Sequence, residues 1–162
     1  MLRIIIAGSR KLDDYPFFEK ICLDIISKEQ YAREIPNKEV EIVSGNNPGG
    51  ADFYGEKFCK KFLNREATLF PADWNDLTPP VILGTNHYGS YNKLAGNNRN
   101  QKMADYLLEN GGGILIAFDA EESKARTGTK DMIRISKKAK FKVYHVKCED
   151  KKSHKIKIWN GE

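Results

Sequence analysis

The feature that most constrains the fold of this chain is a short aliphatic run, residues 2–7, which is interrupted by Arg3 alone and ends directly at Gly8. A strand that is apolar at nearly every position must be covered on both faces, which is typical of a parallel sheet packed between helices. Further short candidate strands occupy residues 39–44, 67–70, 113–118 and 141–146, and all of them except 113–118 have polar residues among the apolar ones.

Segments of helical periodicity separate these runs. One begins at Asp13 or Asp14 and carries Phe17, Phe18, Ile21, Cys22, Ile25 and Ile26 on one side, and the others cover residues 51–64, 100–110 and 127–139. Strands that alternate with crossover helices predict an α/β fold, a three-layer sandwich with a mostly parallel central sheet. In such sheets, ligands bind at the carboxyl ends of the strands.

The length of 162 residues predicts one folded unit, residues 1–147, followed by a basic C-terminal tail, residues 148–162. Residues 71–98 form a long connection, within which residues 75–95 are expected to be a loop insertion. The N-terminal apolar run is too short to span a membrane and differs from a signal peptide, which predicts a cytoplasmic protein without membrane contact.

Cysteine and histidine usage indicates neither disulfides nor metal. Cys22, Cys59 and Cys148 are odd in number and widely spaced, so we expect free thiols. The three histidines show no metal-ligand spacing, and the sequence indicates no metal site and no cofactor.

The positive charge is concentrated near the C-terminus. The net charge is +5, yet residues 130–162 contain 11 Lys or Arg against 4 Asp or Glu. A basic surface of this kind attracts nucleic acid, although a solvated helix face and a lysine-rich end explain it equally well.

Glycine-rich or polar turns follow the predicted strands, and they carry the candidate binding residues. Gly8, Ser9 and Arg10 follow the first strand, where a glycine permits close approach of a ligand and an arginine grips phosphate through two hydrogen bonds. Ser44–Asp52 follows the second strand, with Gly45 and Gly50 in the turn. It lacks the pattern of a P-loop or a dinucleotide fingerprint. Asp52 either favours the first turn of the next helix or accepts hydrogen bonds from ribose hydroxyls.

The later turns supply an aromatic group and two further anion sites. Asp73 and Trp74 follow the third strand; the indole either stacks on a base or anchors the loop. Gly96, Arg99 and Asn100 lie where the long connection meets a helix, whose N-terminus favours anions. Gly128 and Thr129 begin the next helix and form a second candidate anion site, unless Thr127 serves simply as the N-cap of that helix. Asp119 lies at the end of the fourth strand.

Five motifs, taken in order, resemble the YspA-like branch of the SLOG superfamily. They are Ala7–Arg10, Ser44–Gly45 with Gly50–Asp52, Phe70–Trp74, Ala95–Gly96 with Arg99, Asn100 and Met103, and Gly128–Thr129. This superfamily comprises Rossmann-like domains related to the DNA-processing protein DprA (Smf) and to the Lonely Guy phosphoribohydrolases. The resemblance covers residues 2 to about 146. It implies a Rossmann-like fold and a nucleotide-derived ligand, with Arg10, Arg99 and Thr129 as phosphate contacts.

The resemblance leaves catalysis open. Lonely Guy enzymes cleave the bond between a base and ribose 5′-monophosphate, and they carry a glutamate three residues after the threonine, where this chain has Met132. A glycosidic cleavage requires a carboxylate to stabilise the oxocarbenium-like transition state or to activate water. Asp131, Asp52 and Asp119 are therefore the catalytic candidates if the protein is an enzyme, and Asp73 is a fourth acidic residue near a strand end.

The insertion suggests a further hypothesis, a lid in which Tyr88 and Tyr91 close over the base. Three functions follow from the sequence. The first is a module that binds, senses or sequesters a nucleotide-derived molecule; the second is a nucleotide N-glycosidase; the third is single-stranded DNA binding through the basic C-terminal segment. Because related domains commonly pair through their helices, we also expect a homodimer or a higher homo-oligomer.

Overall fold

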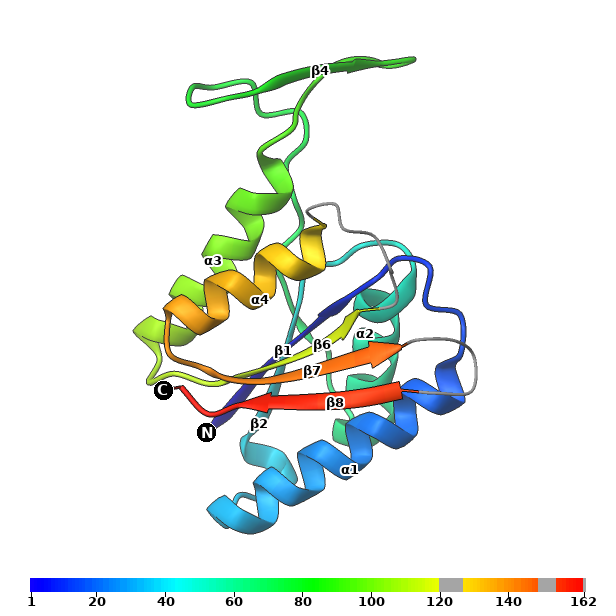
Figure 1. The fold of residues 1–162 in the computed structure, drawn as a ribbon, viewed down its shortest axis with the longest axis vertical. Coiled ribbons are helices and arrows are strands. Elements are labelled where there is room, and N and C mark those ends of the chain that lie inside the picture. Colours follow the sequence, from blue (N-terminus) through cyan, green and yellow to red (C-terminus); the bar gives the residue numbers. More distant parts are fainter. Residues whose placement is uncertain (120–126, 149–153, 162) are drawn as a thin grey trace.

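The fold was analysed in a computed structural model that describes residues 1–119, 127–148 and 154–161 (Figure 1). Six strands form one sheet in the order β3-β2-β1-β6-β7-β8. The first five are parallel to their neighbours, and β8 is antiparallel to β7. The strands of this sheet are β1 (Leu2–Gly8), β2 (Val40–Ser44), β3 (Thr68–Leu69), β6 (Ile114–Asp119), β7 (Lys142–Cys148) and β8 (His154–Trp159).

Four α-helices cover the two faces of this sheet and complete the predicted three-layer α/β sandwich, which is Rossmann-like (Figure 1). The helices are α1 (Tyr15–Arg33), α2 (Gly50–Leu63), α3 (Ala95–Glu109) and α4 (Gly128–Lys138), and a 3-10 turn, Asn37–Glu39, precedes β2. Alternate residues of β1 and β6 belong to two separate apolar cores. One core contains side chains of α1 and α2, and the other contains side chains of α3 and α4.

The aliphatic runs form strands because helices cover both of their faces. All six residues of β6 are buried, and Ile4, Ile5 and Ile6 of β1 are inaccessible to solvent. None of the helices in the described part of the chain is both long and apolar enough to cross a bilayer. Cys22, Cys59 and Cys148 are free thiols, as the spacing predicts.

The C-terminal segment differs from its prediction as a tail. Residues 154–159 form β8, whose register places Tyr144 opposite Ile158 and Val143 opposite Trp159. The alternation of lysine and isoleucine from Lys155 to Ile158 is a period-two pattern that indicates a strand, although the structure leaves both kinds of side chain exposed. The high lysine content of the segment conceals this pattern in the sequence.

The long connection also contains regular structure. Residues 83–92 form a hairpin of β4 (Leu83–Asn86) and β5 (Gly89–Asn92), separate from the large sheet. The helix expected from residue 100 begins at Ala95, with the Asn92 side chain accepting a hydrogen bond from the Leu94 N–H at 2.9 Å. Glycine and asparagine have low helix propensity, which concealed this first turn in the sequence.

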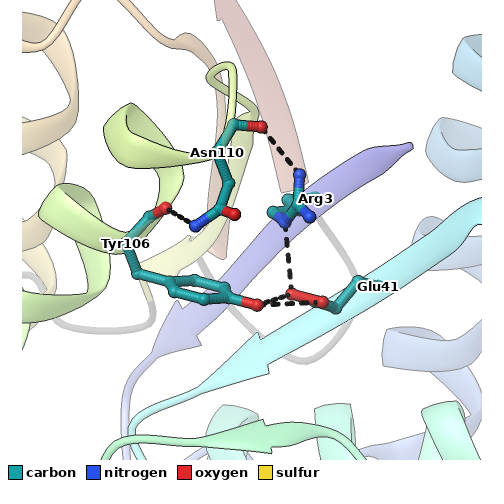
Figure 2. Close-up of polar contacts among 4 residues, drawn as sticks. All are labelled: Arg3, Glu41, Tyr106 and Asn110. Atoms are coloured by element: carbon teal, nitrogen blue, oxygen red, sulfur yellow. Dashed lines mark hydrogen bonds and ion pairs between the residues drawn. The ribbon is translucent and has the colours of Figure 1, made fainter.

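A polar cluster attaches α3 to the amino ends of β1 and β2 (Figure 2). The Tyr106 hydroxyl donates to both carboxylate oxygens of Glu41, at 2.6 and 3.0 Å. Arg3 Nε lies 3.5 Å from Glu41 Oε2, and Arg3 Nη1 donates to the carbonyl of Asn110 at 2.7 Å. The guanidinium therefore satisfies a free carbonyl at the C-terminus of α3, a position that favours cations. This attachment lies at the end of the sheet opposite the predicted site.

Candidate functional site

A cavity of about 450 Å³ opens at the carboxyl end of β1. From β1 the chain continues to β2 and β3, toward one edge of the sheet, and from β6 it continues to β7 and β8, toward the other edge. The direction of strand addition therefore reverses between β1 and β6. In doubly wound sheets, the crevice at such a reversal is where ligands bind. The cavity is lined by Ala7, Gly8, Ser9, Arg10, Lys11, Asn47, Asp52, Trp74, Lys93, Gly96, Asn97, Arg99, Asn100, Met103, Thr127, Gly128 and Thr129.

Most of the predicted binding residues lie in this wall, although they come from five separate segments of the chain. Those that line the cavity are Gly8, Ser9, Arg10, Asp52, Trp74, Gly96, Arg99, Asn100, Gly128 and Thr129. Gly45, Gly50 and Asp73 lie outside the lining. The roles of the lining residues as ligand contacts stay predictions.

Gly45 and Gly50 permit close packing behind the wall. A β-carbon on Gly45 would lie 2.6 Å from Nη1 of Arg99. Gly50 has a φ of +68°, and a β-carbon there would collide with the carbonyl oxygen of Ser9. The two glycines therefore shape the cavity from behind.

The β1–α1 turn is held by its own backbone. The Ser9 N–H donates to the carbonyl of Phe118 at 3.0 Å, and its carbonyl accepts from the Ala51 N–H at 3.2 Å. The Ser9 hydroxyl oxygen accepts from the Lys11 N–H at 3.1 Å. These bonds connect the turn to β6 and α2, while the side chains of Arg10 and Lys11 remain exposed at the cavity.

Arg99 and Asp52 are both buried in the wall, and their charges influence each other. Arg99 donates through Nη1 to the carbonyl of Gly45 at 2.5 Å and through Nε to Oδ1 of Asn100 at 2.9 Å. Burial lowers the pKa of Arg99, and the charge of Asp52 partly offsets this effect. Burial also raises the pKa of Asp52, whereas the hydrogen bond from the Asn47 N–H and the charge of Arg99 lower it in part. Two N–H groups of Arg99 are thus already occupied in holding the surrounding loops.

Asn100 connects the beginnings of α3 and α4. Its amide nitrogen lies 3.3 Å from the carbonyl of Gly128 and 3.3 Å from Oδ2 of Asp131. Asp131 is buried, and its other oxygen accepts from Arg134 at 2.9 Å. Its carboxylate lies outside the cavity lining and has two structural partners.

The other acidic candidates also differ in position. Asp119 Oδ2 lies 3.0 Å from Nε2 of His145 on the neighbouring strand, outside the cavity lining. Burial lowers the pKa of His145, and the hydrogen bond with Asp119 partly offsets this shift. Asp73 is exposed and accepts a hydrogen bond from the Asn75 N–H at 3.2 Å. Among the four acidic candidates, Asp52 alone lines the cavity.

Trp74 provides the aromatic wall. A β-carbon on Gly96 would lie 3.3 Å from Cη2 of Trp74, so the indole lies directly over the first turn of α3. On its other side the indole meets Tyr91 edge-on, with 6.4 Å between ring centroids. Trp74 therefore both anchors the hairpin and lines the cavity. Tyr91 and Tyr88, the residues of the lid hypothesis, do not line it in this structure.

Two helix N-termini meet at the cavity. At α4, the Thr127 hydroxyl accepts from the Lys130 N–H at 3.2 Å, which confirms Thr127 as the N-cap. At α3, no side chain of the described residues caps the helix. N–H groups in the first turn of a helix have no partners within it, and they favour an anion nearby.

The sequence interpretation missed two cations of the wall, Lys11 and Lys93. Lys11 directly follows Arg10, which was a usable signal. Lys93 enters the site because the hairpin returns the chain to the start of α3, and no local pattern indicated that return. Within the described residues, no carboxylate pairs with the ammonium group of Lys11 or Lys93.

No protein-family model matches the chain, and neither the curated proteins nor the solved structures contain a significant match. In the described ranges, no three His, Cys, Asp or Glu side chains are grouped closely enough to hold a metal ion.

Proposed function

We propose that the protein binds a nucleotide-derived small molecule in the cavity at the carboxyl end of β1, as a sensing or sequestering module. The observation that carries this proposal is the combination of an indole wall with an excess of positive charge. Arg10, Lys11, Lys93 and Arg99 line the cavity against the single carboxylate of Asp52. Phosphate groups match this excess, and a base matches the face of Trp74.

The dimensions of the site support the same class of ligand. Small-molecule sites commonly have volumes of about 300–1,000 Å³, and this cavity measures about 450 Å³. The uncapped first turn of α3 and the first turn of α4 face it from one side, where they favour phosphate oxygens. The same loops carry the sequence resemblance to the YspA-like branch of the SLOG superfamily. The free cysteines suit a reducing compartment, and we propose the cytoplasm.

One observation favours the N-glycosidase as a second candidate. Asp52 is a buried carboxylate in the cavity wall, and burial raises its pKa. A carboxyl group with a raised pKa is suited to general acid–base catalysis. Asp131 and Asp119 would need to reach the cavity from behind the wall. Single-stranded DNA binding depends instead on the exposed lysines of β8, for which protection of a sheet edge is an alternative role.

The experiment is mass spectrometry of a nucleotide mixture after incubation with the protein and again after its denaturation. We expect one nucleotide-derived species to be depleted from solution and to return intact. Free base that accumulates with time, and that is lost in Asp52→Asn, would establish the enzyme instead. A protein that depletes no nucleotide and releases no base would contradict both candidates.

Variants of the wall test the site with the nucleotide so identified. Lys11→Gln removes a charge-assisted contact, and we expect roughly tenfold weaker binding, since each such bond contributes about 1.5 kcal/mol or more. Trp74→Ala should weaken binding by a comparable factor or more, because stacking on a base contributes about 1–3 kcal/mol. Lys20→Gln, on the exposed side of α1, is the matched control and should leave affinity unchanged. Equal effects of Lys11→Gln and Lys20→Gln would contradict this placement of the ligand.

A further inference from the structure

The β4–β5 hairpin extends away from the rest of the molecule. Figure 1 shows it beyond the first turn of α3, apart from the large sheet, and it pairs with no strand of that sheet. Tyr88 at its tip is 98% exposed, and Leu83 on β4 is 59% exposed. A two-stranded hairpin is marginally stable alone in water, and a third strand or a packed face is needed for independent stability.

The hairpin is uncharged in a chain that is rich in charge. Residues 77–92 contain no Asp, Glu, Lys or Arg, whereas all 27 Lys and Arg and all 22 Asp and Glu residues lie elsewhere. This is the longest such stretch in the sequence, and it also contains the exposed side chains of Leu77 and Ile82. Exposed strand edges in monomers are usually protected by lysine, proline or bulges. β4 and β5 contain neither lysine nor proline.

The two edges of the hairpin differ in whether their backbone groups are free to pair with another strand. In an antiparallel ladder, residue pairs that exchange backbone hydrogen bonds alternate with pairs whose backbone groups point away from the partner strand. The hydrogen bond from the Lys93 N–H to the Ile82 carbonyl shows that the pair next to it, Leu83 and Asn92, is of the second kind. The backbone groups of Leu83 and Thr85 therefore face outward on β4. On β5, the outward Asn92 N–H already donates to the carbonyl of Trp74 at 2.7 Å. Among the described residues, none forms a backbone hydrogen bond with the outer edge of β4.

We propose that β4 is a self-association edge that pairs antiparallel with β4 of a second copy, so that two hairpins form one four-stranded sheet. An antiparallel pair related by a twofold axis is self-complementary, because each copy presents the same outward groups to the other. The absence of charge removes the like-charge repulsion that a twofold contact otherwise places across the axis. The exposed Leu83 side chains of the two copies come together on the shared sheet.

The hairpin is fixed firmly enough to act as an arm. The Tyr91 ring covers Gly84 on the opposite strand, where a β-carbon would lie 2.6 Å from the ring. Trp74 contacts Tyr91 and hydrogen-bonds Asn92, and Asn92 in turn receives the Leu94 N–H at the start of α3. These contacts hold the base of the arm against α3, so its outer edge is presented in one direction.

The test is the molar mass of the full chain, measured by sedimentation equilibrium over a concentration series. We expect a dimer for the unmodified protein. Leu83→Lys places two ammonium groups across the twofold axis, and Thr85→Pro removes an outward N–H while the bonds between β4 and β5 remain. Both variants should increase the dimer dissociation constant by about tenfold or more. Circular dichroism of each variant should show an unchanged fold.

Leu108→Lys is the matched control. Leu108, on α3, is 52% exposed, which is similar to the exposure of Leu83. The substitution also tests whether two copies of the chain pair through their helices instead. We expect this variant to dimerise like the unmodified chain. A monomer at every concentration would overturn the proposal. So would a dimer that Leu108→Lys disrupts and that Leu83→Lys and Thr85→Pro leave intact.

Discussion

Gly50 illustrates how one missing side chain shapes the cavity. Its φ of +68° belongs to the left-handed region, and its α-carbon packs against the backbone of Ser9 and Arg10. A β-carbon at this position would lie 2.5 Å from the Arg10 α-carbon. The position of Arg10 at the cavity thus depends on a residue that does not itself line it.

The substitution Gly50→Ala should therefore lower the free energy of unfolding by about 2–4 kcal/mol, through backbone strain and collision together. Urea denaturation measures this loss. Gly111→Ala is the control, because Gly111 has a φ of +96° with no atom within 4 Å of an added β-carbon. It should show the strain alone, about 1–2 kcal/mol. Equal losses in the two variants would show that contact with the Arg10 turn is unimportant.

Between elements, a buried carboxylate joins α1 to β7. Glu29 accepts hydrogen bonds from Lys142 at 2.6 Å, from Arg33 at 2.8 Å and from the Tyr144 hydroxyl. Burial alone would raise the pKa of Glu29, but the hydrogen bonds from these three partners lower it from about 4.5 to about 2. The carboxylate is thus stabilised by the fold in its charged form.

A folded-state pKa below the unfolded value stabilises the protein at higher pH, and this stabilisation is lost as the pH falls through the folded pKa. Between about pH 4.5 and pH 2, Glu29 should therefore account for a loss of up to about 3 kcal/mol in unfolding free energy. In Glu29→Gln, that part of the acid sensitivity should disappear. Urea denaturation across this pH range is the measurement. Glu109→Gln, at an exposed position of α3, should keep the acid sensitivity of the unmodified protein.

Across the whole molecule, stability is distributed from the centre of the sheet outward. β6 is buried at every residue and pairs with β1 and β7, whereas β3 has two residues and one neighbour. The contacts of the hairpin with Trp74 and with the start of α3 lie at its base. Local opening requires less free energy where few apolar contacts and few hydrogen bonds must be broken.

We therefore expect amide hydrogen exchange to be slowest in β6 and β1 and fastest in the hairpin, when the protein is dilute. Mass spectrometry of proteolytic fragments resolves these segments. Exchange from the hairpin that is as slow as exchange from β6, at a concentration where the chain is monomeric, would contradict this order. It would mean that the arm is stable without a partner.

Much of the fold could be predicted because its signals are local. A fully apolar run indicates a strand covered on both faces, and helical periodicity indicates the helices between the strands. The exceptions are elements without an apolar pattern. β8 is rich in lysine, the first turn of α3 is rich in glycine and asparagine, and the hairpin is an uncharged run without long alternation.

The candidate site also has features that local sequence signals predict and features that they do not. The sequence alone determined which turns lie at the carboxyl edge of the sheet, since each follows a predicted strand, and most of the lining residues follow from that rule. Only the tertiary structure decided the role of each side chain. It turned Arg99 toward Gly45 and Asp52, placed Asp131 and Asp119 outside the lining, and brought in Lys93. Those outcomes depend on contacts between residues distant in sequence, which no local pattern encodes.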